Sequence, residues 1–540
     1  MAFELSVLGE FAKVQGGFAY KSKDFQSTSN CPVLKIKNVR FGHIEYEDTS
    51  FIDLALAEET NNWSTKEGDI LISMTGSGPN APQSLVGRVG RVWRDDPTAW
   101  INQRVGRIQV ESKTLHPDFV FYLLSQKESQ DFLVSNSSGS ANQANISGKT
   151  IELLPCPRLE FEESRDIANI LRSLDEKIIL NRQINQTLEQ IAQAVFKSWF
   201  VDFDPVIDNA LAAGNPIPDE LQERAERRQQ KLAKPDHKPL PDDIRQLFPS
   251  EFELTEELGW VPKGWEAMPV SKIIDINPKV SLPKGVVAKF ADMKALPTTG
   301  YSVTGVIEKA YSGGAKFQNG DVLLARITPC LENGKTGIVD FLNGNEAGFG
   351  STEFITMRKK ESIETSFIAC LARDANFRKH CMQSMVGSSG RQRVQNACFD
   401  AYYMPIPGSE EILMLFSKMT SANFLKMSIN RLESQSLTNL RDTLLPKLIS
   451  GELRLPSEAL ADAEQQLYTF DKGASMTPTD MKHIRHQLNW SQEFLARQLG
   501  ISLRSISRYE AGHTQIPSPV DIAVRSFLKG NRGQGYFGRK

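Results

Sequence analysis

The chain has 540 residues, enough for several domains with a core in each. Apolar residues make up 40 % and charged residues 24 %, which is typical of a soluble globular protein. We find no apolar run of about 18 residues and no secretory signal pattern, so no membrane span is predicted and a cytoplasmic location is expected. The formal charge of -2 does not exclude nucleic acid as a partner, because local patches decide that question.

The cysteines show no CxxC spacing, so we interpret them as free thiols in a reducing cytosol rather than a disulfide or zinc framework. The six are Cys31, Cys156, Cys330, Cys370, Cys381 and Cys398.

Two stretches of the chain carry the same string of local features. The offset between them drifts only from 252 (320 minus 68) to 249 (430 minus 181), a register that chance does not hold, so we infer a duplication. A protein with such a duplicated unit is expected to recognise two targets, one with each copy. The matched segments are Gly68 to Ile72 with Gly320 to Leu324, Ser137 to Gly139 with Ser388 to Gly390, Leu154 to Pro157 with Met404 to Pro407, and Asn181-Arg182 with Asn430-Arg431.

Residues 1–160 are predicted to form a first globular unit of strands and turns. From Glu163 to about Phe200 the pattern becomes helical, with no Gly or Pro. This first long helix, assigned to residues 161–201, would span on the order of 55 Å. An apolar stripe of that length needs a partner helix.

The partner is a second long helix, from about Glu410 to Ile449 and assigned to residues 409–451, with a similar apolar stripe. Two such helices are expected to pack antiparallel as a coiled coil that holds the two units apart. Asn181 and Asn430 fall in the predicted seam, where a buried Asn fixes the register; alternatively, both face solvent.

The remaining segments complete an α+β architecture. A proline-rich stretch, residues 202–262, is expected to be a connector with one short helix. Residues 263–408 form the second globular unit, 452–475 a linker, and 476–530 a small all-α domain.

No catalytic or cofactor motif is complete. Ser147-Gly148-Lys149-Thr150 and Asn333-Gly334-Lys335-Thr336 resemble the end of a phosphate-binding loop, but the required upstream glycine is replaced by Gln143 and Pro329. We therefore expect no cofactor, no metal and no enzymatic activity.

Polar loops at matched places are the candidate base readers. Arg, Asn and Gln can contact base edges in the major groove, while Lys, Ser and Thr serve phosphates. Because the loops differ between otherwise matched copies, two different targets are indicated; alternatively, the loops are simply solvated. The candidates are Thr75, Ser77, Arg88, Ser140, Asn142 and Gln143 in the first copy and Arg326, Thr328, Asn333, Lys335, Arg391, Gln392 and Arg393 in the second.

The segment from Ser491 to Pro517 has the pattern of a helix-turn-helix, with Gly500 at the turn and Ser502 capping the second helix. That helix would present Leu503, Arg504, Ser507 and Arg508 outward. The segment resembles the lambda-repressor-like family, and the resemblance implies DNA contacts from these residues and from Gln492. A protein-binding or vestigial domain is the alternative.

The body of the chain, up to about residue 456, resembles the specificity subunit of a type I restriction-modification system. The resemblance rests on Leu8 to Glu10 with Gly16 to Tyr20, both Gly-Asp segments, Phe200 to Val206, Glu257 to Glu266 and Leu445 to Leu453. It implies two target recognition domains, each reading one half of a split, asymmetric DNA site. It also implies two methyltransferase subunits docked on the helices, and restriction subunits that supply ATP-driven cleavage.

A different class of function is a transcriptional regulator, in which the terminal domain binds an operator and the duplicated body is a sensor or oligomerisation module. The helix-turn-helix tail departs from the usual plan of the specificity subunits. It could add affinity, anchor the complex or repress its own operon.

Overall fold

A computed structural model describes residues 3–78, 85–111, 113–140, 143–235, 238–388, 390–455, 478–487, 491–499 and 503–512. The chain divides into two compact units, Met1–Gly451 and Glu452–Lys540. No described helix has the length and apolar character to cross a membrane. All six cysteines are free thiols, and only Cys330 is not buried.

The first copy is built on a five-stranded sheet with the strand order β2-β10-β6-β8-β4. A short strand near the N-terminus, β1, pairs antiparallel with β13, which leads into the first long helix. Two helices, α2 and α3, follow β10; α2 places Phe119, Phe121 and Leu123 in the core, and α3 places Leu133 there. The elements are β1 (Leu5–Val7), β2 (Ala12–Gly16), β4 (Gly42–His43), β6 (Ile70–Ser73), β8 (Val89–Arg91), β10 (Val105–Val110), α2 (Pro117–Ser125), α3 (Lys127–Ser135), α4 (Gly148–Glu152) and β13 (Pro155–Pro157).

The second copy repeats this plan with one strand fewer in its central sheet. Its central sheet has the order β17-β24-β21-β22, and the pair β16 and β25 corresponds to β1 and β13. The duplication inferred from the sequence is therefore a duplication of fold. The elements are β16 (Trp265–Pro269), α9 (Val270–Ile273), β17 (Ile274–Ile276), β21 (Val322–Ala325), β22 (Thr336–Ile338), β24 (Phe354–Lys359), α10 (Thr365–Arg373), α11 (Ala375–Gln383) and β25 (Tyr403–Pro407).

A smaller side sheet also recurs in both copies. In the first, β3 pairs antiparallel with β5 and parallel with β9; in the second, β18 pairs antiparallel with β19 and parallel with β23. The strands are β3 (Pro32–Leu34), β5 (Ser50–Phe51), β9 (Trp100–Ile101), β18 (Val287–Ala291), β19 (Ile307–Ala310), β20 (Lys316–Phe317) and β23 (Gly348–Gly350).

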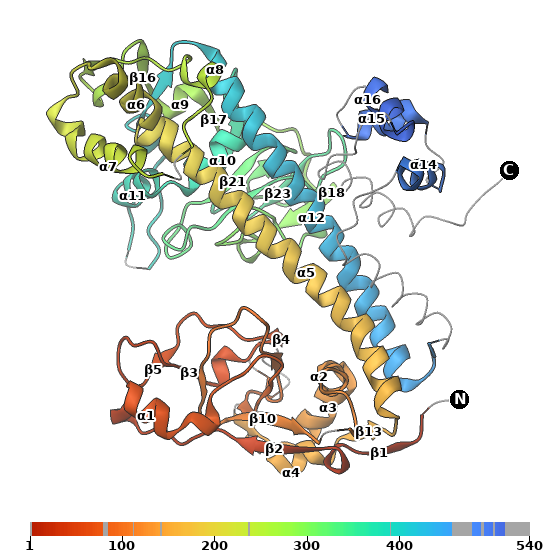
Figure 1. The fold of residues 1–540 in the computed structure, drawn as a ribbon. Helices are drawn as coiled ribbons and strands as arrows, with labels where there is room; N and C mark the ends of the chain where they lie inside the picture. The colour runs from red at the N-terminus through yellow and green to blue at the C-terminus, as the bar shows by residue number, and fades with distance from the viewer. Residues whose placement is uncertain are drawn as a thin grey trace. The chain divides into compact units, whose positions relative to one another are not determined.

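Two long helices, α5 (Phe161–Phe196) and α12 (Glu410–Ser450), run side by side with one copy at each end (Figure 1). Asp175 of α5 contacts Arg441 of α12, whereas Asn185 of α5 contacts Met427. The sequence numbers therefore run in opposite directions, and the helices are antiparallel, as predicted.

Both predicted seam asparagines are buried between the helices, which excludes the solvent-facing alternative. Asn181 is 1 % exposed and donates its Nδ2 to Glu433 Oε2 at 2.9 Å; Asn430 is fully buried and donates to Asn185 Oδ1 at 2.8 Å. The Oδ1 atoms of Asn181 and Asn430 are buried without a partner. These polar contacts fix the register of the pair.

The segment after α5 is more structured than the expected connector with one short helix. It holds α6 (Asp204–Ala213), α7 (Gln222–Leu232) and α8 (Asp242–Arg245), followed by the antiparallel strands β14 (Phe252–Thr255) and β15 (Gly259–Pro262). Arg228 of α7 bridges Asp204 and Asp208 of α6, so α7 is fixed to the fold.

The second unit contains three described helices, α14 (Pro478–Gln487), α15 (Gln492–Leu499) and α16 (Leu503–Glu510). Leu495, Ala496 and Ile506 are buried in this unit. With this all-α domain, the α+β fold class predicted from the sequence is confirmed.

Candidate nucleic-acid interface

In the first copy, the two candidate loops are joined by a small sheet with the strand order β11-β12-β7: β7 (Thr75–Gly76), β11 (Ser138–Ser140) and β12 (Gln143–Asn145). Thr75 pairs with Asn145 in this sheet, and Thr75 Oγ1 donates to Asn145 Oδ1 at 2.8 Å. Ser77 forms a bridge with Leu85, and Gln143 is exposed. Asn142 lies outside the described residues.

In the second copy, the equivalent loops also lie against each other. The backbone N–H of Thr328 donates to the carbonyl of Gln392, and that of Val394 donates to the carbonyl of Arg326. Thr328 Oγ1 also accepts the N–H of Gln392 at 3.1 Å. The structure thus brings Arg326, Thr328, Gln392 and Arg393 together, although Thr328 itself is buried.

Several candidate side chains in the second copy are already engaged. Arg393 holds Glu353 through both Nε and Nη2, and this contact lowers the pKa of the Glu353 carboxyl. Arg326 Nη2 donates to the Val394 carbonyl at 3.0 Å, and Lys335 Nζ donates to the Met293 carbonyl at 2.8 Å. Asn333 and Arg391 are exposed.

Arg88 is placed inside the first copy rather than on its surface. It is 2 % exposed, and its guanidinium donates to the carbonyls of Ile36, Val39 and Leu85 at 2.6 to 2.9 Å. Contact with a base would require all three hydrogen bonds to break. The geometry therefore favours a structural role, in which Arg88 ties the side sheet to the loop beside β8.

The duplicated Gly-Asp segments hold the scaffold and do not present chemistry to a ligand. Both Gly68 and Gly320 have a φ of +87°, in the left-handed region that favours glycine. Asp69 pairs with Arg107 at 3.1 Å, and Asp321 pairs with Arg358 at 2.7 Å. Each pair fastens the turn before one central strand to the neighbouring strand. The sequence did not lead us to Arg107 or Arg358, although each arginine follows its aspartate at nearly the same interval in both copies.

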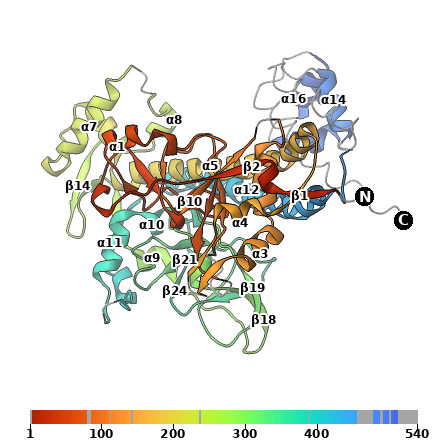
Figure 2. The same ribbon diagram turned by 90° about the horizontal axis from the view of Figure 1, so that it is seen from below.

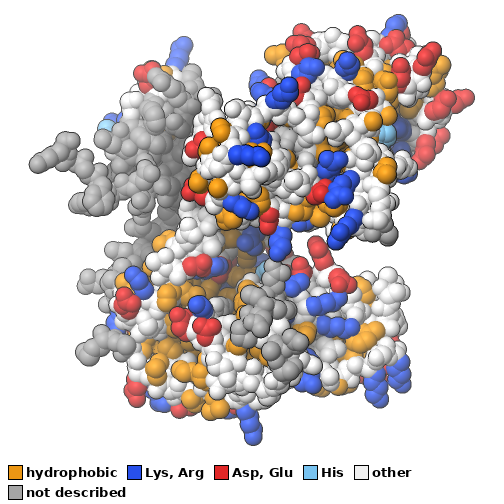
Figure 3. Space-filling view, turned by 180° about the vertical axis from the view of Figure 1, so that it is seen from behind, with side chains coloured by type: hydrophobic (Ala, Val, Ile, Leu, Met, Phe, Trp, Pro, Cys, Tyr) orange, Lys and Arg blue, Asp and Glu red, His pale blue; other side chains and the backbone are white. Residues whose placement is uncertain are grey.

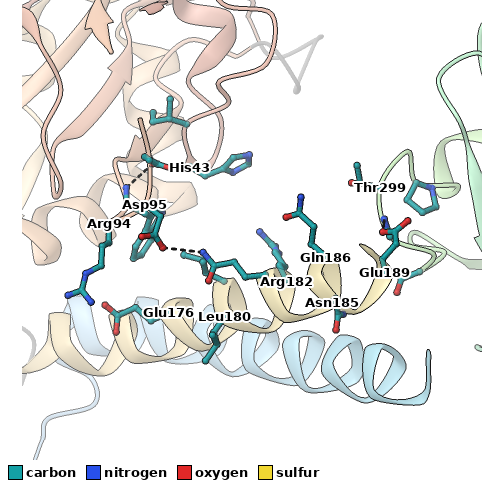
Figure 4. Close-up of a pocket in the computed structure, with 18 of the residues that line it drawn as sticks. His43, Arg94, Asp95, Glu176, Leu180, Arg182, Asn185, Gln186, Glu189 and Thr299 are labelled. Carbon is teal, nitrogen blue, oxygen red and sulfur yellow. Dashed lines mark hydrogen bonds between the residues drawn. The ribbon is translucent and has the colours of Figure 1, made fainter. Parts of the chain in front are cut away.

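A cavity of about 1000 Å³ lies where both copies border α5 (Figure 4). On one side, Gln183 Nε2 of α5 donates to Asp95 at 3.4 Å; on the other, Glu189 accepts the N–H of Gly300 at 2.7 Å. The lining holds four arginines and six carboxylates, so it is net negative. Because phosphates are attracted to positive surfaces, we do not assign DNA to this cavity.

In the second unit, the predicted recognition helix presents Leu503, Arg504, Ser507 and Arg508 as exposed side chains. Gln492 is engaged internally, because its Nε2 donates to Glu510 Oε2 at 2.7 Å. Glu510 also pairs with Arg485 at 2.6 Å. Ser502 lies outside the described residues.

The phosphate-loop resemblance is explained by local structure. Ser147 caps α4 by accepting the N–H of Thr150 at 3.1 Å, and Thr336 is a buried residue of β22. No cluster of three or more His, Cys, Asp or Glu residues with the geometry of a metal site occurs in the described part of the chain.

Two stretches of the chain match models of known families. Residues 2–190 match the model of the type I restriction modification DNA specificity domain, and residues 481–522 match a helix-turn-helix model. The chain therefore carries a type I specificity domain and a helix-turn-helix domain, and both predicted resemblances are confirmed.

Curated relatives are specificity subunits of type I restriction enzymes. The HindI subunit of Haemophilus influenzae is 27 % identical over 414 residues, covering 72 % of this chain and 87 % of the relative. The EcoAI subunit of Escherichia coli is 31 % identical over 212 residues, covering 38 % of this chain and 33 % of the relative. The MjaIX subunit of Methanocaldococcus jannaschii is 23 % identical, covering 63 % and 69 %.

Solved structures of such subunits align along most of the chain. The S subunit from M. genitalium has a TM-score of 0.47 at 13 % identity, covering 83 % of this chain and 96 % of that one. The HsdS subunit from Thermoanaerobacter tengcongensis has a TM-score of 0.27 at 13 % identity, covering 84 % and 97 %.

Proposed function

We propose that this chain is the DNA-recognition subunit of a type I restriction-modification complex, and that each copy reads one half of a bipartite, asymmetric site. One observation carries the proposal: two copies of one fold, with differently equipped loop pairs, stand at opposite ends of two antiparallel helices. The subunit is non-catalytic, and it directs adenine methylation and DNA cleavage by its partners. Apart from Arg88, which is buried on backbone carbonyls, the loop residues named above are the proposed base readers.

We further propose that two methyltransferase subunits dock on the long helices, and that restriction subunits complete the complex in the cytoplasm. Exposed apolar side chains on these helices support a docking role. Leu425, Ile429 and Leu432 of α12 are 64, 48 and 56 % exposed and follow steps of four and three, so they share one helix face. Burying such a row of apolar side chains against a partner protein is favourable, because it removes apolar surface from water.

The direct test is to express the chain with the methyltransferase subunit of its own system and to map N6-methyladenine across the host genome. We expect a split motif with two defined halves and a fixed gap, with or without residues 476–540. Loss of all sequence-specific DNA binding on removing those residues would favour the alternative, a regulator that binds DNA through its terminal domain. No split motif from a soluble, competent complex would overturn the proposal.

The spacer helices provide a second test. The change deletes four residues from α5 and four from α12, at facing positions next to the contact between Asn181 and Asn430. Each deletion shortens its helix by about one turn, or about 5.4 Å. At about 3.4 Å per base pair, the gap should shorten by one or two base pairs. Deleting four residues from α12 alone is the matched control, because it breaks the seam and should abolish methylation. An unchanged gap after the paired deletion would contradict the ruler function.

A further inference from the structure

The two copies differ sharply in charge in one segment. Between β17 and Gly320 (residues 277–319), the second copy has six lysines and two carboxylates, a net charge of +4. The equivalent segment of the first copy (residues 17–67) has six basic and eight acidic residues, a net charge of -2. Because the fold is shared, the positive charge is not a requirement of the scaffold.

Two of these lysines lie on the outer face of the sheet β19-β18-β23-β20. Lys309 Nζ lies 4.7 Å from the centre of the Phe290 ring, and Lys316 Nζ lies 5.0 Å from that of Tyr311. Both rings pack on Phe349, at 5.0 and 5.1 Å between centroids. The opposite face carries Phe317, which belongs to the core. We call the outer face, with Phe290, Lys309, Tyr311 and Lys316, the lysine sheet.

Within the described residues, neither Lys309 nor Lys316 pairs with a carboxylate, whereas Lys289 pairs with Glu308 at 2.8 Å. A contact with an aromatic ring orients an ammonium group without neutralising it. The lysine sheet therefore offers two positioned and uncompensated positive charges.

The lysine sheet is continuous with the candidate reading loops of the second copy. Beyond β18, Lys335 of the first loop donates to the Met293 carbonyl. Beyond β23, the N–H of Ser351 donates to the Ala291 carbonyl, and Glu353 holds Arg393 of the second loop. Figure 2 shows the region of β18 and β19 and the loop after α11 extending to the same side of the unit. Lys and Arg side chains are spread over the face drawn in Figure 3.

We infer that the lysine sheet binds the phosphate backbone of duplex DNA beside the half-site read by the second copy. The inference rests on the proposed function and deepens it. Lysines bind phosphates as point charges, which adds affinity and salt dependence but no sequence information. The two halves of the site are then held by different means, because the first copy lacks an equivalent positive sheet.

The test compares the double variant K309Q/K316Q with K21Q/K23Q, which removes the same charge from exposed lysines of the first copy. The full chain, in complex with its methyltransferase subunit, is titrated with a duplex carrying the methylated motif and with a scrambled duplex, over a series of KCl concentrations. Losing two phosphate contacts should reduce the slope of log affinity against log salt by about 1.8, at about 0.9 per contact. The preference for the motif over the scrambled duplex should stay constant.

An unchanged slope in K309Q/K316Q, or an equal change in K21Q/K23Q, would overturn the inference. If K309Q/K316Q instead loses the methyltransferase subunit while its salt slope is unchanged, the sheet is a protein-docking surface. Failure of the proposed function is distinguishable, because the unaltered complex would then show no preference for the motif.

Discussion

Replacing Asp321 with alanine tests whether the Gly-Asp segments hold each copy together. The Asp321 side chain is 1 % exposed and accepts Nε and Nη2 of Arg358 at 2.7 and 2.8 Å, together with the N–H of Gln318 at 2.7 Å. Removing one partner of a buried ion pair costs about 3–5 kcal/mol, because the other charge stays buried and unpaired. Arg358 is 23 % exposed, so water reaches part of its guanidinium, and we expect a loss near the lower end, about 3 kcal/mol.

The matched variant is Asp69→Ala in the first copy. Its carboxylate is 20 % exposed and meets Arg107 through one contact of 3.1 Å, so we expect a smaller loss, about 1.5 kcal/mol. Urea unfolding of the full chain, with hydrogen exchange to locate the affected copy, measures both. Adding Arg358→Met to Asp321→Ala should restore part of the stability, because the unpaired charge is removed. A loss below about 1 kcal/mol for Asp321→Ala, or one no larger than for Asp69→Ala, would refute the reasoning.

Three further predictions follow from the site. Arg393→Gln should reduce discrimination at one base pair of the second half-site by about 1–3 kcal/mol, measured by competition with single-base variants; a uniform loss for every duplex would instead indicate a phosphate contact. Arg88→Met should lower the melting temperature but leave the methylated motif unchanged; a changed first half would contradict its structural role. Burial alone would raise the pKa of Glu510, but hydrogen bonds from Arg485 and Gln492 bring it below its ordinary value. The stability from this group is thus complete above about pH 4.3 and lost as the pH falls further, so in calorimetry Glu510→Gln should reduce the acid sensitivity of the second unit. Equal sensitivity in both proteins would contradict it.

The sequence was most informative where one physical signal dominated. The helix expected from Glu163 to about Phe200 is α5, Phe161–Phe196, continued by a π-helical turn at Lys197–Val201. A long apolar stripe without Gly or Pro leaves few alternatives to a helix. The two matched Asn residues indicated the seam, because a polar group at a seam position recurs only where it fixes register.

The prediction that residues 202–262 form a connector with one short helix was wrong, because it took the prolines as a sign of irregular structure. Pro205 occupies the first turn of α6, and Pro218 and Pro241 directly precede the short 3-10 helix at Asp219–Leu221 and α8. Proline favours a helix start, because the N–H it lacks has no partner there. A dense run of prolines therefore marked several helix starts rather than an unstructured segment.

The sequence predicted which loops form the candidate site, but it did not predict which of their side chains are buried or already hydrogen-bonded. Sequence position put Arg88 and Arg393 in polar loops, yet one is buried on carbonyls and the other is held by Glu353. Partners distant in sequence decide these states. Likewise Met419 and Leu440, apolar residues of the second long helix, are 39 and 47 % exposed. An α-helix has about 3.6 residues per turn, whereas a heptad repeat assumes about 3.5. Residues at heptad spacing on a straight helix therefore move gradually away from the face that contacts the partner helix.

Because the two long helices are long, a small rotation at one end produces a large displacement at the other. α5 has 36 residues and spans about 54 Å, so a rotation of about 3.6° at one end moves the other by about 3.4 Å, one base-pair step. At the end near the second copy, Phe196 and Phe200 meet Phe367 and Phe416 at centroid distances of 5.1 to 6.1 Å. Four edge-on ring contacts lie at this end, whereas the seam at mid-length is held by asparagine hydrogen bonds. Under the proposed function, the stiffness of these aromatic contacts, together with the length of the helices, would set how strictly the complex accepts one gap and rejects a gap one base pair longer.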